Sequence, residues 1–306
     1  MVYNIVITMV LYRGEHMKKE VVGNYYICNG EIYPLQNKEV LKGITSSSIY
    51  EVIRVVKGIP LFVEEHIKRM KRSAELLGSR LYRSDKDILK DILKLIKINN
   101  VNNLNIKLVC DGKYDKDQNF LIFFIKSYYP ERELYKRGIH TILYKGKRKN
   151  PNIKSVNEEF KRKVKEKLKE KKAFEALLVD ENNNITEGSR SNVFFVKGEK
   201  VYTAPSSKVL LGITRSHIVG ICKKLGIEII ERPIAVEELD KFDGAFITGT
   251  SVNVLPITVI DNRKYTSVIN PIISKISNEY VKEVKEYLIK ERKKIKNIIK
   301  FEKTYC

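Results

Sequence analysis

Two short segments of the 306-residue chain have residue types that could hold a phosphate dianion. Gly212-Ile213-Thr214 opens a predicted helix, so backbone N–H groups, the Thr214 hydroxyl and the helix dipole can converge on an anion. Gly249-Thr250 follows a predicted strand and offers a small-residue loop where the backbone can approach a ligand closely. An ordinary N-cap is the alternative interpretation of Thr214, and it is compatible with anion binding.

Two ionisable residues depend on their neighbours for their significance. Lys154 follows a basic loop, Lys145–Pro151, and precedes a predicted helix. Taken alone it would be a solvated surface amine, as would any lysine in a chain so rich in lysine. Glu187 stands beside Gly188 and, taken alone, would be an acidic residue of a turn.

Four strings in the second half of the chain resemble the signature of a known family. They are Asn152–Asn157, Ile185–Phe194, Leu210–Arg215 and Phe246–Ser251. In this order and at these separations they resemble the class IV pyridoxal phosphate (PLP)-dependent aminotransferases. That family includes branched-chain aminotransferases, D-amino acid transaminases and aminodeoxychorismate lyases. The similarity extends from about Asn24 to beyond Asp261.

The resemblance implies a role for each string. Lys154 would carry PLP as a Schiff base and move a proton between substrate Cα and cofactor C4′, which requires an electropositive site that lowers its pKa. Glu187 would pair with the pyridine nitrogen and so make the ring an electron sink. Leu210 would lie under the ring. The phosphate would be bound by Ile213, Thr214, Gly249 and Thr250.

A helix in the first half of the chain completes the predicted cofactor site. Glu65–Met70 resembles the family's His-x-x-Arg helix, which makes Arg69 the phosphate arginine. A planar guanidinium can bind two phosphate oxygens at once, which a lysine cannot. His66 reads as a helix-surface or packing residue and is given no catalytic role.

The predicted substrate pocket departs from the family pattern. Tyr50–Arg54 resembles the pocket strand, and alternation places Tyr50 and Arg54 on one face. Lys107 and Ser251 complete the predicted substrate-binding residues. The departures are Ser46-Ser47-Ser48 in place of a Gly-Asp-Gly turn, Lys107 and Asp111 where relatives carry arginines, and Glu159 where branched-chain enzymes carry a tyrosine. The subgroup and the choice between L- and D-substrates therefore stay open.

The elements that must position these residues follow one another irregularly. Strands are predicted at Asn24–Pro34 (a hairpin around Asn29-Gly30), Ile49–Val56, Leu104–Cys110, Phe120–Lys126, Ile139–Tyr144, Ala176–Asp180, Val193–Val196, Val201–Thr203, Ile227–Glu231 and Ala245–Thr248. Helices are predicted at Glu64–Leu77, Asp85–Ile98, a segment containing Val156, Phe160, Val164 and Leu168, Arg215–Leu225, and after Pro271. This order argues for an α+β or irregular α/β fold, not a regular doubly wound sheet.

Length and punctuation predict two domains of unequal size. We expect a smaller α/β domain over 17–133 and a larger PLP-binding domain over 134–306, which the resemblance makes the pseudo-barrel of a fold-type IV enzyme followed by a C-terminal helix. Arg13–Met17 can be encoded by a stretch that resembles a ribosome-binding site followed by a start codon. Residues 1–16 are therefore expected to precede the true start or to form a disordered extension.

The composition suggests a cytoplasmic protein with a solvated, lysine-rich surface. The formal net charge of +21 raises nucleic acid as a partner, but lysines spread along helices usually face water. The four cysteines have neither CxxC pairing nor metal-like spacing, so no metal is predicted and a reduced thiol set fits best. The apolar run from Val2 to Tyr12 is too short to span a bilayer.

The resulting interpretation is a PLP-dependent aminotransferase that exchanges an amino group between an amino acid, with branched-chain amino acids as one candidate class, and a 2-oxo acid. The resemblance implies a homodimer. The nearest alternative is a PLP-dependent 4-amino-4-deoxychorismate lyase, which eliminates pyruvate. An alternative of another class is a basic nucleic-acid-binding protein on an enzyme-like fold, motivated by the net charge.

Overall fold

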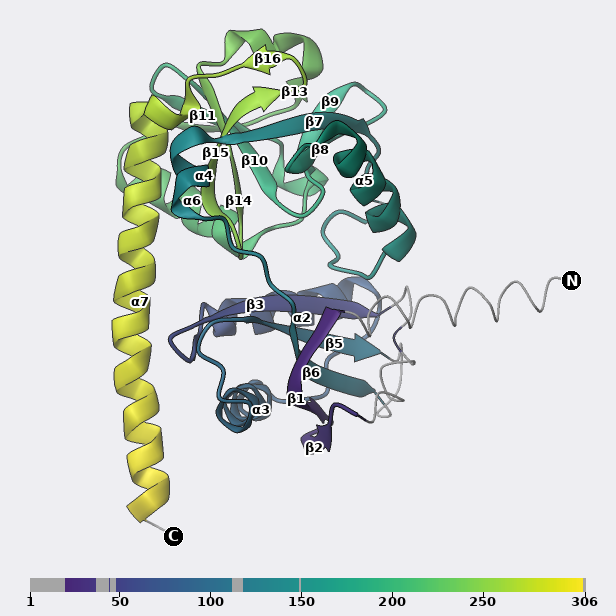
Figure 1. Ribbon diagram of the computed structural model, residues 1–306, viewed down its shortest axis with the longest axis vertical. Helices are drawn as coiled ribbons and strands as arrows, with labels where there is room; N and C mark the ends of the chain where they lie inside the picture. The colour runs from purple at the N-terminus through teal and green to yellow at the C-terminus, as the bar shows by residue number, and fades with distance from the viewer. Residues whose placement is uncertain (1–19, 37–43, 45–47, 112–117, 149, 305–306) are drawn as a thin grey trace, which may run out of the picture. The chain divides into compact units, whose positions relative to one another are not determined.

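The structure, a computed structural model, describes residues 20–36, 44, 48–111, 118–148 and 150–304, with side chains of the last helix described to residue 294. The chain divides into two compact units, drawn in Figure 1. The described residues up to Ser127, together with 154–156 and 284–304, form the first unit. Residues 128–153 and 157–283 form the second. The predicted start at Met17 and the substitutions at Ser46 and Ser47 lie outside the described residues.

This division differs in three details from the one expected at residue 133. The change of unit comes after Ser127, and the end of the C-terminal helix groups with the first unit. The short segment 154–156 also groups with the first unit, although the residues on both sides of it belong to the second.

The first unit is built on a six-stranded antiparallel sheet in the order β2-β1-β6-β5-β3-β4. Its strands are β1 (Val21–Cys28), β2 (Glu31–Pro34), β3 (Ile49–Val56), β4 (Ile59–Pro60), β5 (Asn105–Asp111) and β6 (Asn119–Ile125). Its helices α2 (Val63–Leu76) and α3 (Asp85–Ile98) pack on β3 and on β1 and β6, respectively.

Local sequence signals explain these elements. Asn29 (φ 50°) and Gly30 (φ 93°) both adopt left-handed backbone, as the tight turn between β1 and β2 requires. Helix α2 buries Ile67, Met70 and Ala74 at helical spacing. Helix α3 begins after Ser84, whose hydroxyl accepts the backbone N–H of Asp87 at 3.1 Å. The predicted hairpin and helices are confirmed.

The second unit is built on a ten-stranded mixed sheet in the order β12-β11-β10-β14-β15-β7-β8-β9-β13, with β16 paired to β15. Strand β7 runs parallel to both of its neighbours, β8 and β15. The strands are β7 (Ile139–Lys145), β8 (Glu175–Val179), β9 (Asn184–Gly188), β10 (Asn192–Lys197), β11 (Lys200–Thr203), β12 (Ile229–Glu231), β13 (Ile234–Ala235), β14 (Gly244–Gly249), β15 (Asn253–Ile260) and β16 (Arg263–Lys264). The helices are α4 (Arg132–Arg137), α5 (Glu158–Lys171), α6 (Ile213–Lys224) and α7 (Pro271–Thr304), with 3-10 turns at Ser206–Lys208, Val236–Lys241 and Ser267–Ile269. Both sheets with their helices confirm the predicted α+β class.

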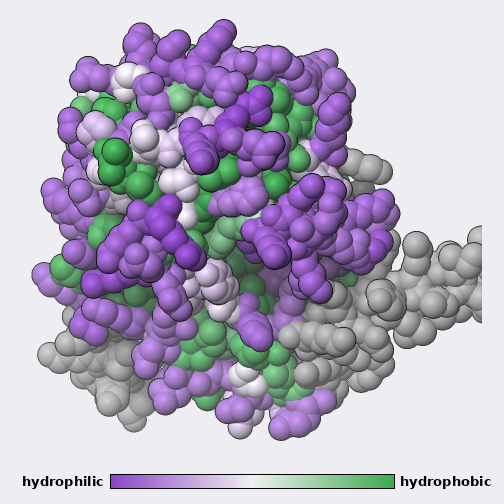
Figure 2. All heavy atoms as spheres, turned by 45° about the horizontal axis from the view of Figure 1, so that its top comes forward, coloured by the Kyte–Doolittle hydropathy of each residue, from purple (hydrophilic) through white to green (hydrophobic). Residues whose placement is uncertain are grey.

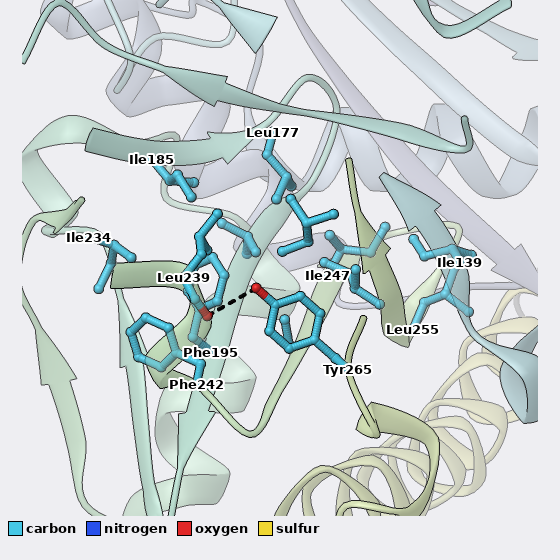
Figure 3. Packing of buried hydrophobic residues seen from close by; sticks show 14 of the residues in the cluster. Ile139, Leu177, Ile185, Phe195, Ile234, Leu239, Phe242, Ile247, Leu255 and Tyr265 are labelled. Atoms are coloured by element: carbon cyan, nitrogen blue, oxygen red, sulfur yellow. Dashed lines mark hydrogen bonds between the residues drawn. The ribbon is translucent and has the colours of Figure 1, made fainter. Parts of the chain in front are cut away.

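The core of the second unit is an apolar cluster on this sheet, seen from close by in Figure 3. Side chains from distant parts of the chain meet there, among them Leu177, Phe195 and Leu255. The one hydrogen bond drawn joins the Tyr265 hydroxyl to the carbonyl oxygen of Leu239 at 3.0 Å. Burial raises the pKa of Tyr265 to about 12, so this hydroxyl keeps its proton and stays a donor at neutral pH.

Charged side chains dominate the surface. In the face shown in Figure 2, hydrophilic residues cover most of the described area and hydrophobic ones lie scattered between them. Along α5 the cations pair with acids one turn away. The pairs are Lys161 with Glu158, Arg162 with Glu166, Lys163 with Glu159 and Lys167 with Glu170. Within the described residues, none of the helices combines the length and apolar character needed to cross a lipid bilayer.

Candidate active site

Lys154 lies in a short extended segment that pairs with the edge of β3 in the first unit. Its carbonyl oxygen accepts the backbone N–H of Tyr50 at 2.9 Å, and Ser155 forms a β-bridge with Ile49. The N–H of Val156 donates to the carbonyl oxygen of Ser48 at 3.1 Å. Helix α5 accordingly begins only at Glu158, and the prediction that Val156 is part of this helix is wrong because its backbone N–H is bonded to Ser48.

Two amines lie over the ring of Tyr50. The Nζ atom of Lys154 is 4.8 Å from the ring centroid, and that of Lys107 is 5.3 Å from it. Lys107 stands opposite Val52 in the β3–β5 pair, which makes it a diagonal neighbour of Tyr50 on the same face. Its side chain is 3% exposed and pairs with Glu20 at 3.6 Å. The structure thus brings together Tyr50, Lys107 and Lys154, all predicted site residues.

Arg69 lies in α2 and is held by Glu51. Both Glu51 oxygens accept hydrogen bonds from the guanidinium, from Nε at 2.7 Å and Nη2 at 2.6 Å. Alternation along β3 puts Glu51 on the face opposite Tyr50, where it is fully buried. Burial raises the pKa of Glu51, but the charge of Arg69 and the hydrogen bonds from His66 and Arg69 outweigh burial and hold that pKa well below its usual range.

His66 is the third member of this buried cluster. Its Nδ1 lies 2.8 Å from Oε2 of Glu51 and, because a carboxylate can only accept, Nδ1 is the donor. Burial lowers the pKa of His66, and the charges of Arg69 and Lys154 lower it further against the opposing effect of Glu51. The imidazole is therefore neutral at pH 7, and the sequence-based reading of a packing residue underestimated its contacts.

Glu187 lies in β9 of the second unit and is 3% exposed. The strand replaces the turn that the sequence suggested. Each carboxylate oxygen has its own partner. Nε of Arg148 forms an ion pair with Oε1 at 3.0 Å, and the backbone N–H of Leu210 donates to Oε2 at 3.2 Å. Arg148 belongs to the basic loop that the sequence presented only as surface charge.

A second buried carboxylate, Glu175, supports the end of β9. It accepts the hydroxyls of Ser189 at 2.6 Å and Ser191 at 3.0 Å. A Cβ at Gly188 would overlap with the Ser191 hydroxyl and press on Glu175. Glu175 on the neighbouring strand thus holds the residues that follow Glu187 in place. Glu175 was not predicted from sequence because it begins an otherwise apolar strand.

The N-terminus of α6 has no side-chain cap. Gly212 is the N-cap residue and supplies no side-chain cap, while Ile213 and Thr214 in the first turn are buried. A Cβ at Gly212 would overlap with Oδ1 of Asn192, whose Nδ2 donates to the Leu210 carbonyl at 2.9 Å. Asn192 therefore connects this helix terminus to the segment that contacts Glu187.

Thr248 lies on the strand next to Asn192 and presents a buried, unused hydroxyl. It pairs in register with Asn192, is 1% exposed, and its Oγ1 has no hydrogen-bond partner within the described part of the chain. Gly249 ends β14, and the predicted residues Thr250 and Ser251 follow in the half-buried turn before β15.

The structure thus gathers Glu187, Leu210, Ile213 and Thr214 in one region of the second unit. Arg54 lies half-buried on β3, and its predicted substrate role stays a prediction. Among the residues described, no group of three or more His, Cys, Asp or Glu side chains could hold a metal ion.

Comparison with known proteins gives consistent matches. The sequence model of the family described as amino-transferase class IV matches residues 48–260. D-alanine aminotransferase of Bacillus licheniformis is 32% identical over 70% of this chain and 79% of its own. A probable branched-chain-amino-acid aminotransferase of Rickettsia felis is 31% identical over 79% of this chain and 88% of its own.

Among solved structures, a branched-chain amino acid aminotransferase from Thermobaculum terrenum in its PLP form superposes with a TM-score of 0.75. The two sequences are 21% identical, and the match covers 87% of this chain and 94% of the other. The folds are therefore alike.

Proposed function

The chain belongs to the amino-transferase class IV family, and we propose that it exchanges an amino group between an amino acid and a 2-oxo acid with PLP as its cofactor. One observation carries the proposal. A buried carboxylate, Glu187, is paired with Arg148 and is linked through Leu210 and Asn192 to a helix N-terminus without a side-chain cap. A carboxylate suits a protonated pyridine nitrogen, and a helix N-terminus nearby suits the phosphate group of the same ligand.

The residues of the second unit fit the phosphate group. The α6 N-terminus offers backbone N–H groups without a competing side-chain cap. The unpaired hydroxyl of Thr248, buried beside Asn192 in the described part of the sheet, adds a donor of the kind that a phosphate oxygen requires. We propose that Ile213, Thr214, Gly249 and Thr250 bind the phosphate, with Arg69 as its guanidinium partner.

Lys154 supplies the reactive amine in this proposal. PLP, when bound through such an amine, stabilises negative charge at the substrate Cα. Once the substrate amine has displaced it from the cofactor, the Nζ atom of Lys154 would be free to move the proton between the substrate Cα and the C4′ position of the cofactor. Its backbone is held by Tyr50 and Ser73, at 2.9 and 3.5 Å, so the side chain starts from a fixed point. Leu210 is proposed to pack under the ring.

The substrate class follows from the residues around Tyr50. We propose that Lys107 binds a substrate carboxylate, with Tyr50, Arg54 and Ser251 as further contacts. A buried amine 5.3 Å from an aromatic ring can bind an anion by charge while the ring excludes water. Relatives of both the D-alanine and the branched-chain type support an amino acid substrate and leave these two classes for experiment.

A PLP-dependent lyase acting on 4-amino-4-deoxychorismate is the second candidate, favoured by Lys107 on β5. Pyruvate released from that substrate without an amino acceptor would favour the lyase and contradict the transaminase. Lys147 and Arg148 of the basic loop pair with Glu181 and Glu187, which weakens the nucleic-acid alternative.

We further propose that the enzyme is a homodimer of the cytoplasm. Cys28, Cys110 and Cys222 are free and buried, which supports a reducing compartment. Light scattering of the purified protein at micromolar concentration tests the dimer, and a monomer that retains full activity would contradict it.

Covalent labelling tests the proposed function. Purified protein is incubated with PLP, reduced with borohydride, digested and analysed by mass spectrometry. We expect the label on Lys154, the loss of visible absorption in Lys154→Ala, and no loss in the control Lys163→Ala on the surface of α5. A label on another lysine, or none, would contradict the assignment. Amino acids that bleach the absorption band identify the donor.

A further inference from the structure

Arg148 binds two parts of the chain at the end of β9. Its Nε forms the 3.0 Å ion pair with Oε1 of Glu187, and its Nη2 donates to the carbonyl oxygen of Ser189 at 2.8 Å. The side chains of Arg148 and Glu187 are 18% and 3% exposed, so the pair is shielded from water. One guanidinium therefore fixes both the side chain of Glu187 and the backbone two residues later.

A backbone hydrogen bond holds the other oxygen of the same carboxylate. The N–H of Leu210 reaches Oε2 at 3.2 Å from the segment that precedes α6. Each carboxylate oxygen thus has its own contact, a cation at Oε1 and a backbone hydrogen bond at Oε2, and rotation of the carboxylate about its terminal bond would disturb both. These contacts favour one orientation of the Glu187 carboxylate.

The neighbouring cation in the same loop has a different environment. Lys147 pairs with Glu181, and both side chains are more than half exposed. A surface pair of this kind contributes little, whereas an arginine that forks between a buried carboxylate and a carbonyl oxygen holds a defined geometry. The loop thus contains a natural control next to the residue of interest.

We infer that Arg148 is a positioning residue that orients Glu187 and keeps it ionised for the ring nitrogen of the cofactor. The inference rests on the proposed function. Without Arg148, Glu187 would lose its cationic partner. Burial disfavours the ionised form, so the neutral carboxyl would become more favourable. A neutral or rotated carboxylate would no longer hold a protonated ring nitrogen.

The test compares two ligands that differ only at that nitrogen. Apo-protein is titrated with PLP and with a PLP analogue that has a C–H group in place of the ring nitrogen, and binding is followed by fluorescence quenching. We expect Arg148→Met to weaken PLP binding about tenfold and to leave binding of the analogue unchanged. Arg148→Lys should fall between, and Lys147→Met should match the wild type. In a Glu187→Gln background, Arg148→Met should have no further effect.

The outcomes separate this inference from the proposed function. Equal losses for both ligands, a loss that persists in the Glu187→Gln background, or no loss at all would overturn the role of Arg148. A wild-type protein that binds neither ligand would overturn the proposed function, and this inference with it. Should Arg148→Met fail to fold, Arg148→Lys in the two backgrounds gives the same comparison.

Discussion

The Arg69 guanidinium is fixed by Glu51 through two parallel hydrogen bonds, so that a predicted phosphate-binding arginine is oriented by an acid on the neighbouring strand. Glu51 is fully buried and His66 donates to the same carboxylate. The cluster joins α2 to β3 from inside the first unit. The buried carboxylate of Glu51 thus holds Arg69 in one orientation, and the effect of removing it can be measured in the stability of the protein.

Replacing Glu51 by Gln should lower the free energy of unfolding by about 3–5 kcal/mol, because Arg69 would remain charged and lose its buried partner. Urea unfolding followed by circular dichroism measures the change. Glu75→Gln, an exposed acid on the same helix as Arg69, is the matched control and should stay within about 0.5 kcal/mol of wild type. Equal unfolding midpoints for the two variants would contradict this account.

The lowered pKa of His66 gives stability a defined dependence on pH. Below the ordinary histidine pKa of 6.5 the unfolded chain takes up a proton at His66 that the folded protein refuses, so stability falls with falling pH. The slope from this group approaches about 1.4 kcal/mol per pH unit. His66→Gln should remove that part of the slope between pH 7 and 5. His140→Gln should retain it, and an unchanged slope in His66→Gln would rule the explanation out.

Gly188 should not tolerate a side chain. A Cβ there overlaps with Ser191 and presses on Glu175, so Gly188→Ala should cost about 1–3 kcal/mol and displace the adjoining Glu187. Gly220 in α6 has open space around it, and Gly220→Ala should stabilise by about 1 kcal/mol. Thermal unfolding and PLP titration of both variants decide the matter. Wild-type PLP affinity in Gly188→Ala would show that the end of β9 can relax.

Lys107→Met should separate substrate binding from cofactor binding. We expect KM for the 2-oxo acid to rise about tenfold while PLP affinity stays at the wild-type value, since the variant removes one charge-assisted contact. Lys107→Arg should recover part of the loss, and Lys94→Met on the exposed side of α3 should have none. Loss of bound PLP with an unchanged KM would refute the assignment.

Periodicity and turn chemistry predicted much of the first unit because its elements are locally consistent. Strand β3 and helix α3 have the predicted bounds. Strand β15 was not predicted, because Pro256 lies within it and proline usually excludes a central strand. Strand β15 lies between β14 and β7, and this position depends on tertiary pairing that a local sequence pattern cannot predict.

The candidate site shows the same limit. Glu187 and Gly212 could be singled out from sequence because they lie in the strings that resemble the family signature. Arg148 and Glu175 could not, because the first lies in a lysine-rich loop and the second begins a run of apolar residues. Their partners, Glu187 and Ser189, are far away along the chain, and Ser189 is 14 positions from Glu175. Only the folded backbone brings such pairs together.

The buried Glu175 carboxylate also restricts how the larger sheet can form. Its oxygens depend on the hydroxyls of Ser189 and Ser191, so a shift in the alignment of β8 against β9 would carry these donors away and strand a charge in an apolar interior. A β8–β9 pairing in a shifted register is therefore less stable than the native one, even if it buries the same apolar area. The buried carboxylate therefore favours the native register of β8 against β9 as the sheet forms.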